Sequence, residues 1–242
     1  MRRVSAKFVP RLLTDDQEEN RVEISQELFA NTNGNENFPK NIIIGDETWV
    51  HRCDVETKMQ SSQWMRKGSP RPKKKTRMNR SKFKVLFDVF FDWKIIVHHE
   101  FVPRGQMENK QLYQELLACL RDAVRGKRPE LWENQTWMLH HDNAPAHASL
   151  LIRSYLAKHQ TSVVPHPTYS PDLAPANVFL FPKIKTTLKG RLFQTIEEIR
   201  KNAIRELRAI TESSFQEAFQ KREKRWEPCI ASRWDYFEGD SA

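Results

Sequence analysis

Cysteine is scarce in this chain of 242 residues, and long apolar stretches are absent. Cys53, Cys119 and Cys229 lie far apart, and none belongs to a CxxC pair. Their odd number and wide spacing argue against a disulfide scaffold and a structural zinc site, and favour a reducing compartment. No apolar run approaches the roughly 18 to 20 residues that a membrane-spanning helix needs. Because no apolar stretch follows Arg2 and Arg3, we expect no secretory signal.

Basic residues outnumber acidic ones. The chain has 40 Lys and Arg against 31 Asp and Glu, which gives a formal net charge of +9. The sequence pI of about 9.5 fits a polyanionic partner, most often nucleic acid. A basic surface without such a partner is the alternative, and composition alone does not decide between them. Hydrophobic residues make up 38%, enough for one packed domain with an appendage.

Residues 1–40 are expected to form a helical lead-in to the rest of the chain. Thr14, followed by Asp-Asp-Gln, has the pattern of a helix N-cap with an acidic first turn, and apolar residues at helical spacing continue to Leu28. The polar stretch 31–37 (NTNGNEN) has the composition of a linker. We therefore predict a domain boundary near residue 40, with the main domain over 41–242.

Strands dominate the first part of the main domain and helices the last part. Short β-branched or alternating runs predict strands, and apolar spacings of three and four predict helices. The predicted strands are 41–46, a hairpin partner at 49–55, 82–92, 94–102, 136–142 and 161–165. The predicted helices are 108–126, one begun by Asn143, and most of 177–226, while 64–81 is an exposed loop. This order indicates an α/β fold with a mixed sheet and helices on its faces.

Two aspartates directly follow predicted strands. Asp46 follows Ile-Ile-Ile-Gly, and Asp142 follows the run 137–141. A carboxylate at the end of a buried strand is held by rigid backbone and faces solvent, which suits Mg²⁺ with its oxygen ligands at about 2.1 Å. Such acids bridge the ion pair of two-metal phosphoryl-transfer sites. Each aspartate also has an ordinary alternative, as a turn former after a strand or as a helix N-cap beside Asn143.

Several motifs resemble those of one family. The segments GDETWV (45–50), HHDNAPAH (140–147) and YSPDLAPAN (169–177) closely resemble three motifs of mariner-type DNA transposases. FVPRLL (8–13) resembles a degenerate form of the motif that ends their linker, and CIASRWDYFEGD (229–240) resembles their C-terminal tail. The resemblance therefore extends from one end of the chain to the other.

The resemblance implies a ribonuclease H-like fold, with a mixed five-stranded sheet flanked by helices. In that fold the first acid lies on the first strand, the second ends the fourth strand, and the third lies on the helix after the fifth. The pattern above contains one strand-like run too many for this order. The run 94–102 becomes the third strand if 82–92 is the second.

The resemblance also implies which residues bind metal. Asp46 and Asp142 match the first two members of the family's catalytic acid triad, and the family's spacing places the third member at Asn177. These three positions are then the catalytic and metal-binding residues for a two-ion Mg²⁺ or Mn²⁺ site. Because an amide brings no charge to a hard cation, we expect a weakened site and impaired catalysis. Asn177 also fits a helix N-cap after Pro175, and Asp172 belongs to the family's SPDLAP loop rather than to the ligands.

The basic run within 66–80 resembles the family's loop that reaches the partner subunit and the DNA. Its candidate DNA-binding residues are Arg66, Lys67, Arg71, Lys73, Lys74, Lys75 and Arg77. A solvated charge run or a nuclear-localisation patch is the alternative. We interpret Trp64 and Trp93 as packing residues, and His147 either as a helix contact or as a group that positions a phosphate or water.

The resemblance implies a nuclear DNA transposase, an endonuclease and strand transferase of DNA recombination and integration, acting as a homodimer on DNA. Family members carry helix-turn-helix modules ahead of the linker motif. Since Met1 stands just before that motif, we expect specific recognition of transposon ends to be lost. The alternatives are a domesticated, non-catalytic module that binds DNA or dimerises, and a decayed remnant of a transposable element.

Overall fold

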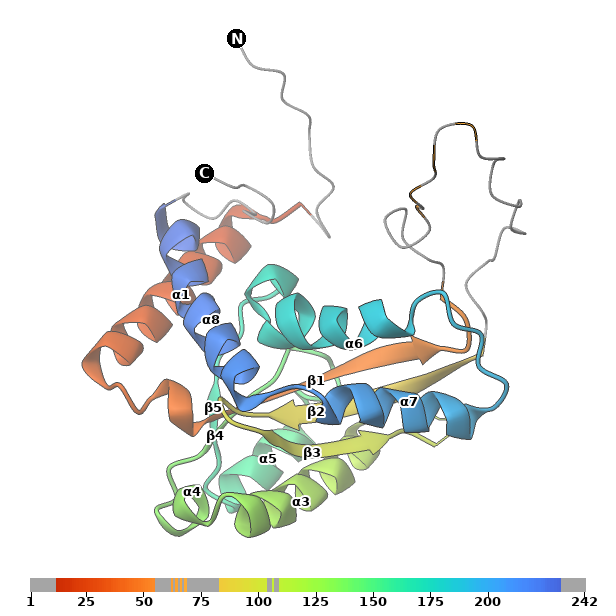
Figure 1. Ribbon diagram of the computed structural model, residues 1–242. Helices are drawn as coiled ribbons and strands as arrows, with labels where there is room; N and C mark the ends of the chain where they lie inside the picture. Colours follow the sequence, from red (N-terminus) through yellow and green to blue (C-terminus); the bar gives the residue numbers. More distant parts are fainter. Residues whose placement is uncertain are drawn as a thin grey trace.

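The protein is described by a computed structural model, and one mixed sheet lies at its centre (Figure 1). The structure describes residues 12–54, 62, 64, 66, 68, 83–103, 106 and 109–231. The strands are β1 (Ile42–His51), β2 (Lys84–Phe91), β3 (Ile96–Phe101), β4 (Met138–His140) and β5 (Ser162–Val164). They form a 5-stranded sheet in the order β3-β2-β1-β4-β5. The strand β2 runs antiparallel to both β1 and β3, whereas β4 runs parallel to both β1 and β5.

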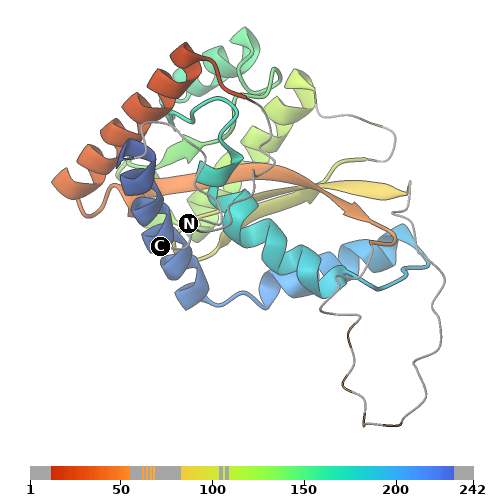
Figure 2. The same cartoon turned by 90° about the horizontal axis from the view of Figure 1, so that it is seen from above.

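Helices cover both faces of this sheet, as the ribbon and the view from above show (Figure 1, Figure 2). The helices are α1 (Asp15–Gly34), α3 (Lys110–Lys127), α4 (Pro129–Glu133), α5 (Leu150–Lys158), α6 (Phe181–Leu188), α7 (Ile196–Arg208) and α8 (Glu212–Ala231). Two 3-10 turns, η1 (Pro39–Asn41) and η2 (Pro171–Leu173), and a π-helical turn, η3 (Ala176–Leu180), complete the elements. The expected α/β architecture, with a mixed five-stranded sheet flanked by helices, is confirmed. No helix in these described segments has the length and apolar character of a membrane span.

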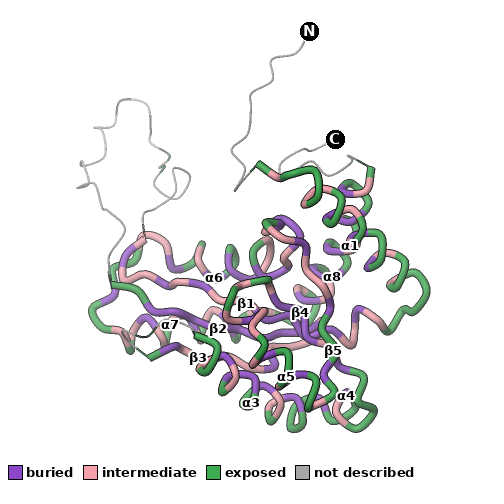
Figure 3. The backbone as a smooth tube through the Cα atoms, turned by 180° about the vertical axis from the view of Figure 1, so that it is seen from behind, coloured by how far each residue is buried: buried purple, intermediate pink, exposed green. Residues whose placement is uncertain are grey.

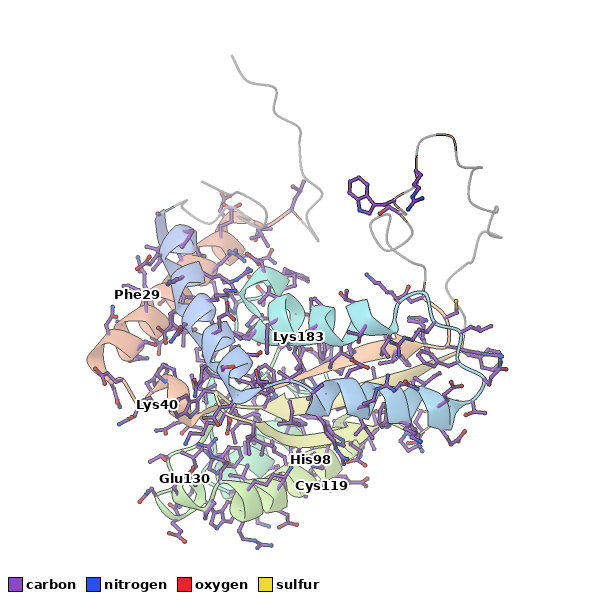
Figure 4. The ribbon with its side chains drawn as sticks, viewed as in Figure 1. Phe29, Lys40, His98, Cys119, Glu130 and Lys183 are labelled. Carbon is purple, nitrogen blue, oxygen red and sulfur yellow. The ribbon has the colours of Figure 1, made fainter. Side chains whose placement is uncertain are left out.

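The sheet separates two hydrophobic cores because strand side chains alternate between its faces. Ile42 and Ile44 of β1 belong to the core beneath α6, α7 and α8, whereas Ile43 belongs to the core beneath α3 and α5. Buried backbone accordingly follows the central strands (Figure 3). On the first face, Lys183 of α6, labelled in Figure 4, donates to Ser214 Oγ of α8 at 2.8 Å.

The strand β1 is one continuous element, so the predicted hairpin partner over 49–55 is wrong. Gly45 makes no turn there. A Cβ atom at Gly45 would lie 2.3 Å from Cε1 of Phe90 on β2, so this glycine makes room for a cross-strand aromatic ring. The runs 82–92 and 94–102 are consequently the second and third strands. The turn between them is closed by Asp92 Oδ1, which accepts from the backbone N–H groups of Lys94 and Ile95.

Two further predictions concern helix boundaries. The helix N-cap at Thr14 and its acidic first turn are confirmed, although α1 continues to Gly34 and so includes part of the predicted linker. The helix predicted to begin at Asn143 begins instead at Leu150, because Ser149 caps it by accepting from the N–H of Ile152. The segment between these two positions forms turns.

The helix α1 packs on the main domain, where Leu28 joins the core and Ser25 Oγ donates to Cys229 Sγ at 3.4 Å. The domain boundary near residue 40 stays a prediction. Trp93 packs partly buried against the core, as expected. Trp64 is 104% exposed, so its interpretation as a packing residue is wrong.

Candidate active site

Strand register brings the two aspartates together. In the parallel ladder between β1 and β4, Ile44 pairs with His140. Asp46 and Asp142 each follow their paired residue by two positions, in the same chain direction. Because side chains two residues apart share a face of the sheet, both carboxylates lie on one face, just past the end of the β1–β4 ladder. The strand β1 continues to His51, so the prediction that it ends at Asp46 is wrong, whereas Asp142 does follow the end of β4. Both residues are half-buried, which leaves part of each open to solvent.

Asn177 approaches the two aspartates from the π-helical turn η3. Its Nδ2 donates to Asp46 Oδ2 at 3.0 Å across a separation of 131 residues. The other oxygen of Asp46, Oδ1, accepts from the N–H of Glu47 at 2.8 Å. Single π-helical turns occur frequently at functional sites, where they widen the helix locally. The structure thus places Asp46, Asp142 and Asn177 in one cluster, and their catalytic role stays a prediction.

The two aspartates differ in their affinity for protons. Burial, together with the negative charges of Glu47 and Asp142, raises the pKa of Asp46 to about 8. Burial also favours the neutral form of Asp142, but hydrogen bonds from His147 and from the N–H of Ala144 outweigh it and lower its pKa. A pair of neighbouring carboxylates with opposed pKa shifts carries repulsion that a bound cation would relieve.

His147 contacts the Asp142 carboxylate. Its Nδ1 lies 2.7 Å from Asp142 Oδ1, and its ring packs against two other rings that also contact each other. The ring centroid of Tyr113 lies 3.9 Å from that of His147, and the His141 ring stacks on it at 5.2 Å. The Tyr113 hydroxyl in turn lies 2.6 Å from His141 Nδ1. His147 is therefore fixed by packing and orients one oxygen of Asp142.

Sequence reasoning missed part of this arrangement. The motif that contains Asp142 pointed to His147, but not to its hydrogen bond with that acid. Tyr113 was visible only as a residue of a predicted amphipathic helix. No local pattern connects Tyr113 with the histidines, since its contact with His141 spans 28 residues.

The donor set fits a hard divalent cation. Carboxylate and amide oxygens are the ligands that Mg²⁺ and Mn²⁺ prefer, and the Asp142 side chain is 45% exposed, which leaves a route for an ion. Among the described residues, no group of three or more His, Cys, Asp or Glu is placed to hold a metal ion. The cluster thus offers two carboxylates, from Asp46 and Asp142, and one amide, from Asn177.

The predicted DNA-binding loop lies almost wholly outside the described residues. Arg66 is described and exposed. The other six candidates, Lys67, Arg71, Lys73, Lys74, Lys75 and Arg77, fall in the part that the structure does not describe. Their contact with DNA stays a prediction.

One acid lies on β1, a second directly follows the neighbouring parallel strand β4, and a third position lies on the π-helical turn after β5. With the strand order, this arrangement defines the ribonuclease H-like class of α/β proteins. Comparison with solved structures supports this assignment. The catalytic domain of Mos1 mariner transposase matches with a TM-score of 0.79 at 27% identity, covering 96% of this chain and 100% of that chain. A pre-cleavage Mos1 transpososome matches with a TM-score of 0.87 at 29% identity, covering 98% of this chain and 68% of that chain.

Sequence comparison identifies the family. A family model described as "Transposase (partial DDE domain)" matches residues 54–134. The Mariner Mos1 transposase of Drosophila mauritiana is 30% identical over 233 residues, which cover 96% of this chain and 66% of that protein. The histone-lysine N-methyltransferase SETMAR of Homo sapiens is 26% identical over 234 residues, or 96% of this chain and 33% of that protein. The chain belongs to the mariner-type transposases and corresponds to their catalytic region. It spans just under two thirds of the Mos1 protein's length.

Proposed function

We propose that this chain binds DNA and catalyses metal-dependent cleavage and transfer of DNA strands, with activity reduced by the asparagine at position 177. The observation that carries the proposal is the cluster formed by Asp46, Asp142 and Asn177. Asp46 lies on β1, Asp142 follows the neighbouring parallel strand β4, and Asn177 contacts Asp46 from the π-helical turn η3. Three oxygen donors on three separate elements are what a divalent-cation site requires.

Each side chain of the cluster has a distinct part in this proposal. Asp46 and Asp142 supply the two negative charges that would hold a cation, and His147 keeps Asp142 in the orientation to do so. When bound, a divalent cation polarises a phosphoryl oxygen and activates the attacking hydroxyl group. Asn177 supplies an oxygen donor without charge, so a cation that depends on this position is held more weakly.

Support for DNA as the substrate comes from charge and from the relatives. The chain carries a net charge of +9, and phosphate contacts by Lys and Arg dominate nucleic-acid affinity. Solved structures of Mos1 include a paired-end complex with a left transposon end, and paired-end complexes with Mn and with Mg. We propose that this chain likewise binds DNA and Mg²⁺ or Mn²⁺, and that it acts as a homodimer in the nucleus.

One observation favours a second candidate, a DNA-binding or dimerising module without catalysis. The amide Nδ2 of Asn177 donates a hydrogen bond to Asp46, which an ionised carboxylate at this position would be unable to do. Without metal, one carboxylate of the acid pair thus already accepts a hydrogen bond from within the protein. A chain that had lost catalysis would keep its fold with this arrangement.

Nicking of supercoiled plasmid DNA in Mg²⁺ or Mn²⁺ separates the two candidates. Asn177→Asp restores the third charge with little change in size, and we expect it to raise nicking about a hundredfold or more, since each 1.36 kcal/mol of barrier is tenfold in rate. Asn134→Asp, the same change at an exposed position on another element, should have no effect. Equal nicking by the parent and Asn177→Asp, with both folded, would contradict the catalytic proposal. DNA binding that weakens with salt would then support the second candidate.

A further inference from the structure

Asp172 is a buried acid in the loop between β5 and η3, and its partner comes from the far end of the sequence. Its side chain is bound by both terminal nitrogens of Arg21 on α1, with Nη1 2.8 Å from Oδ1 and Nη2 on Oδ2. Arg21 is 0% exposed and Asp172 is 2% exposed. The pair therefore joins α1 to this loop inside the protein, across 151 residues of sequence.

A second helix holds the backbone of the same residue. Arg225 of α8 donates from Nη1 to the carbonyl oxygen of Asp172 at 2.9 Å. The helices α1 and α8 lie side by side and are joined where Ser25 contacts Cys229 (Figure 1). One loop residue is thus fixed through its side chain by α1 and through its backbone by α8.

A short path of backbone hydrogen bonds leads from Pro171, the residue before Asp172, to the candidate active site. Ala174 donates its N–H to the carbonyl of Pro171 at 3.2 Å, and Asn177 donates its N–H to the carbonyl of Ala174 at 3.0 Å. Asn177 then contacts Asp46. Few degrees of freedom separate the buried ion pair from the third position of the cluster, so a shift of Asp172 would move Asn177.

Stability alone accounts poorly for such a pair. Replacing a buried ion pair with apolar side chains of similar volume is often neutral or stabilising, whereas removing one partner is costly. A bidentate arginine–carboxylate pair instead fixes the distance and the orientation of its two partners. A loop that places a metal-ligand position next to Asp46 needs such a geometric constraint.

We propose that Arg21 and Asp172 are positioning residues of the active site, and that α1 acts through them as a brace for the loop that carries position 177. The proposal rests on the proposed function, because the position of residue 177 matters for chemistry only if the cluster binds a cation. The brace itself, however, is measurable without metal or DNA.

Amide hydrogen exchange tests the brace directly. Arg21→Met removes the pair on the α1 side, and the segment 169–180 should then exchange about tenfold faster or more, as expected when local opening becomes easier. The matched control is Arg128→Met, which breaks the other buried arginine–aspartate pair, Arg128 with Asp92, where the β2–β3 turn meets α4. In that control the segment 169–180 should keep its protection. Equal exchange of this segment in both variants overturns the proposal.

The double substitution Arg21→Met with Asp172→Leu guards against a variant that fails to fold. It removes both charges, so no unpaired charge remains buried, and the fold should survive while the constraint is lost. We expect the same faster exchange in 169–180 as in the single variant. A well-folded double variant with the parent's protection would also overturn the proposal.

Mn²⁺ affinity in the Asn177→Asp background connects the brace to the site. Adding Arg21→Met should weaken Mn²⁺ binding about tenfold, the lower end of the effect of outer-shell groups on metal sites, while Arg128→Met should not. If Asn177→Asp alone gains no Mn²⁺ affinity, the proposed function fails, and hydrogen exchange still decides the brace. If Asn177→Asp gains affinity but both arginine variants leave it unchanged, the positioning role is wrong and the proposed function stands.

Discussion

The candidate site has two halves that are built differently. Asp46 lies on β1 and Asp142 directly follows β4, and the β1–β4 ladder sets the relative position of these two strands. Asn177 lies on a single π-helical turn, after a loop that contacts α1 and α8. The strand-borne half is thus fixed by backbone pairing within the sheet, whereas the loop before the helix-borne half is bound by side chains of two helices. An uncharged residue fits the helix-borne half without disturbing the sheet, because its amide still bonds Asp46.

The largest expected effect is a loss of DNA nicking when Asp46 or Asp142 is replaced, but not when another buried acid is. In the Asn177→Asp background, either Asp46→Asn or Asp142→Asn should reduce metal-dependent nicking about a hundredfold or more, because each removes a charge that would hold a cation. Asp88→Asn is the control, since Asp88 is buried on β2 and pairs in register with Glu47 outside the cluster. Nicking by the control should stay within about twofold. A similar loss in all three variants would mean that the strands merely need these acids to fold.

Removal of the His147 side chain, which contacts Asp142, should cause a smaller loss, measured as metal affinity. His147→Ala deletes the hydrogen bond to Asp142 Oδ1, and groups that orient metal ligands typically contribute about 10- to 100-fold in metal affinity. Mn²⁺ titration of the Asn177→Asp protein with and without His147→Ala measures this. His159→Ala, at the end of α5, serves as the control. If His147→Ala binds Mn²⁺ as tightly as its parent, the histidine has only a packing role.

The rigidity of the strand-borne half can be tested at Gly45. An added methyl group would collide with the Phe90 ring, so Gly45→Ala should lower the free energy of unfolding by about 1 to 3 kcal/mol. Gly126→Ala has open space around it in α3, and should be neutral or stabilise by up to about 1 kcal/mol. Urea denaturation of both variants measures the difference. Unchanged stability in Gly45→Ala would show that β1 and β2 adapt more freely than this account allows.

The smallest predicted effect concerns Asp46 in the absence of metal. Its pKa is raised to about 8 in the folded protein, so the folded state keeps a proton that the unfolded chain loses above its ordinary value of about 3.9. The contribution of Asp46 to stability therefore falls as the pH rises from about 4 to about 8. Asp46→Asn should remove this slope and raise Tm at pH 8 by on the order of 2 to 4 °C. Thermal melts across this pH range test it, and a lower Tm at pH 8 for the variant would contradict it.

The sheet and the strand-borne acids could be predicted because their signals are local. A run of β-branched residues that ends at an acid is visible in a short window, and parallel strands bring such ends together. The hairpin between 41–46 and 49–55 is wrong because one sequence does not distinguish a glycine that ends a strand from one that accommodates an opposing ring. The start of α5 was misplaced because Asn143 and Ser149 are both good N-cap residues, and only the fold selects between them.

The rest of the site depends on contacts that leave no local pattern. Arg21 and Asp172 are 151 residues apart, and neither residue alone indicates a partner. Position 177 itself was reached through the spacing of family motifs rather than through any property of the asparagine. The hydrogen bond from its amide to Asp46 emerged only from the fold.

Calorimetric titration of the metal-free protein with Mn²⁺ tests the central claim most directly. We expect the parent to bind one ion, held by Asp46 and Asp142, and Asn177→Asp to bind a second. Asp46→Asn should abolish tight binding in both backgrounds. Two ions bound with equal affinity by the parent and by Asn177→Asp, or none by either, would contradict the claim that residue 177 is the weakened third position of a two-ion site.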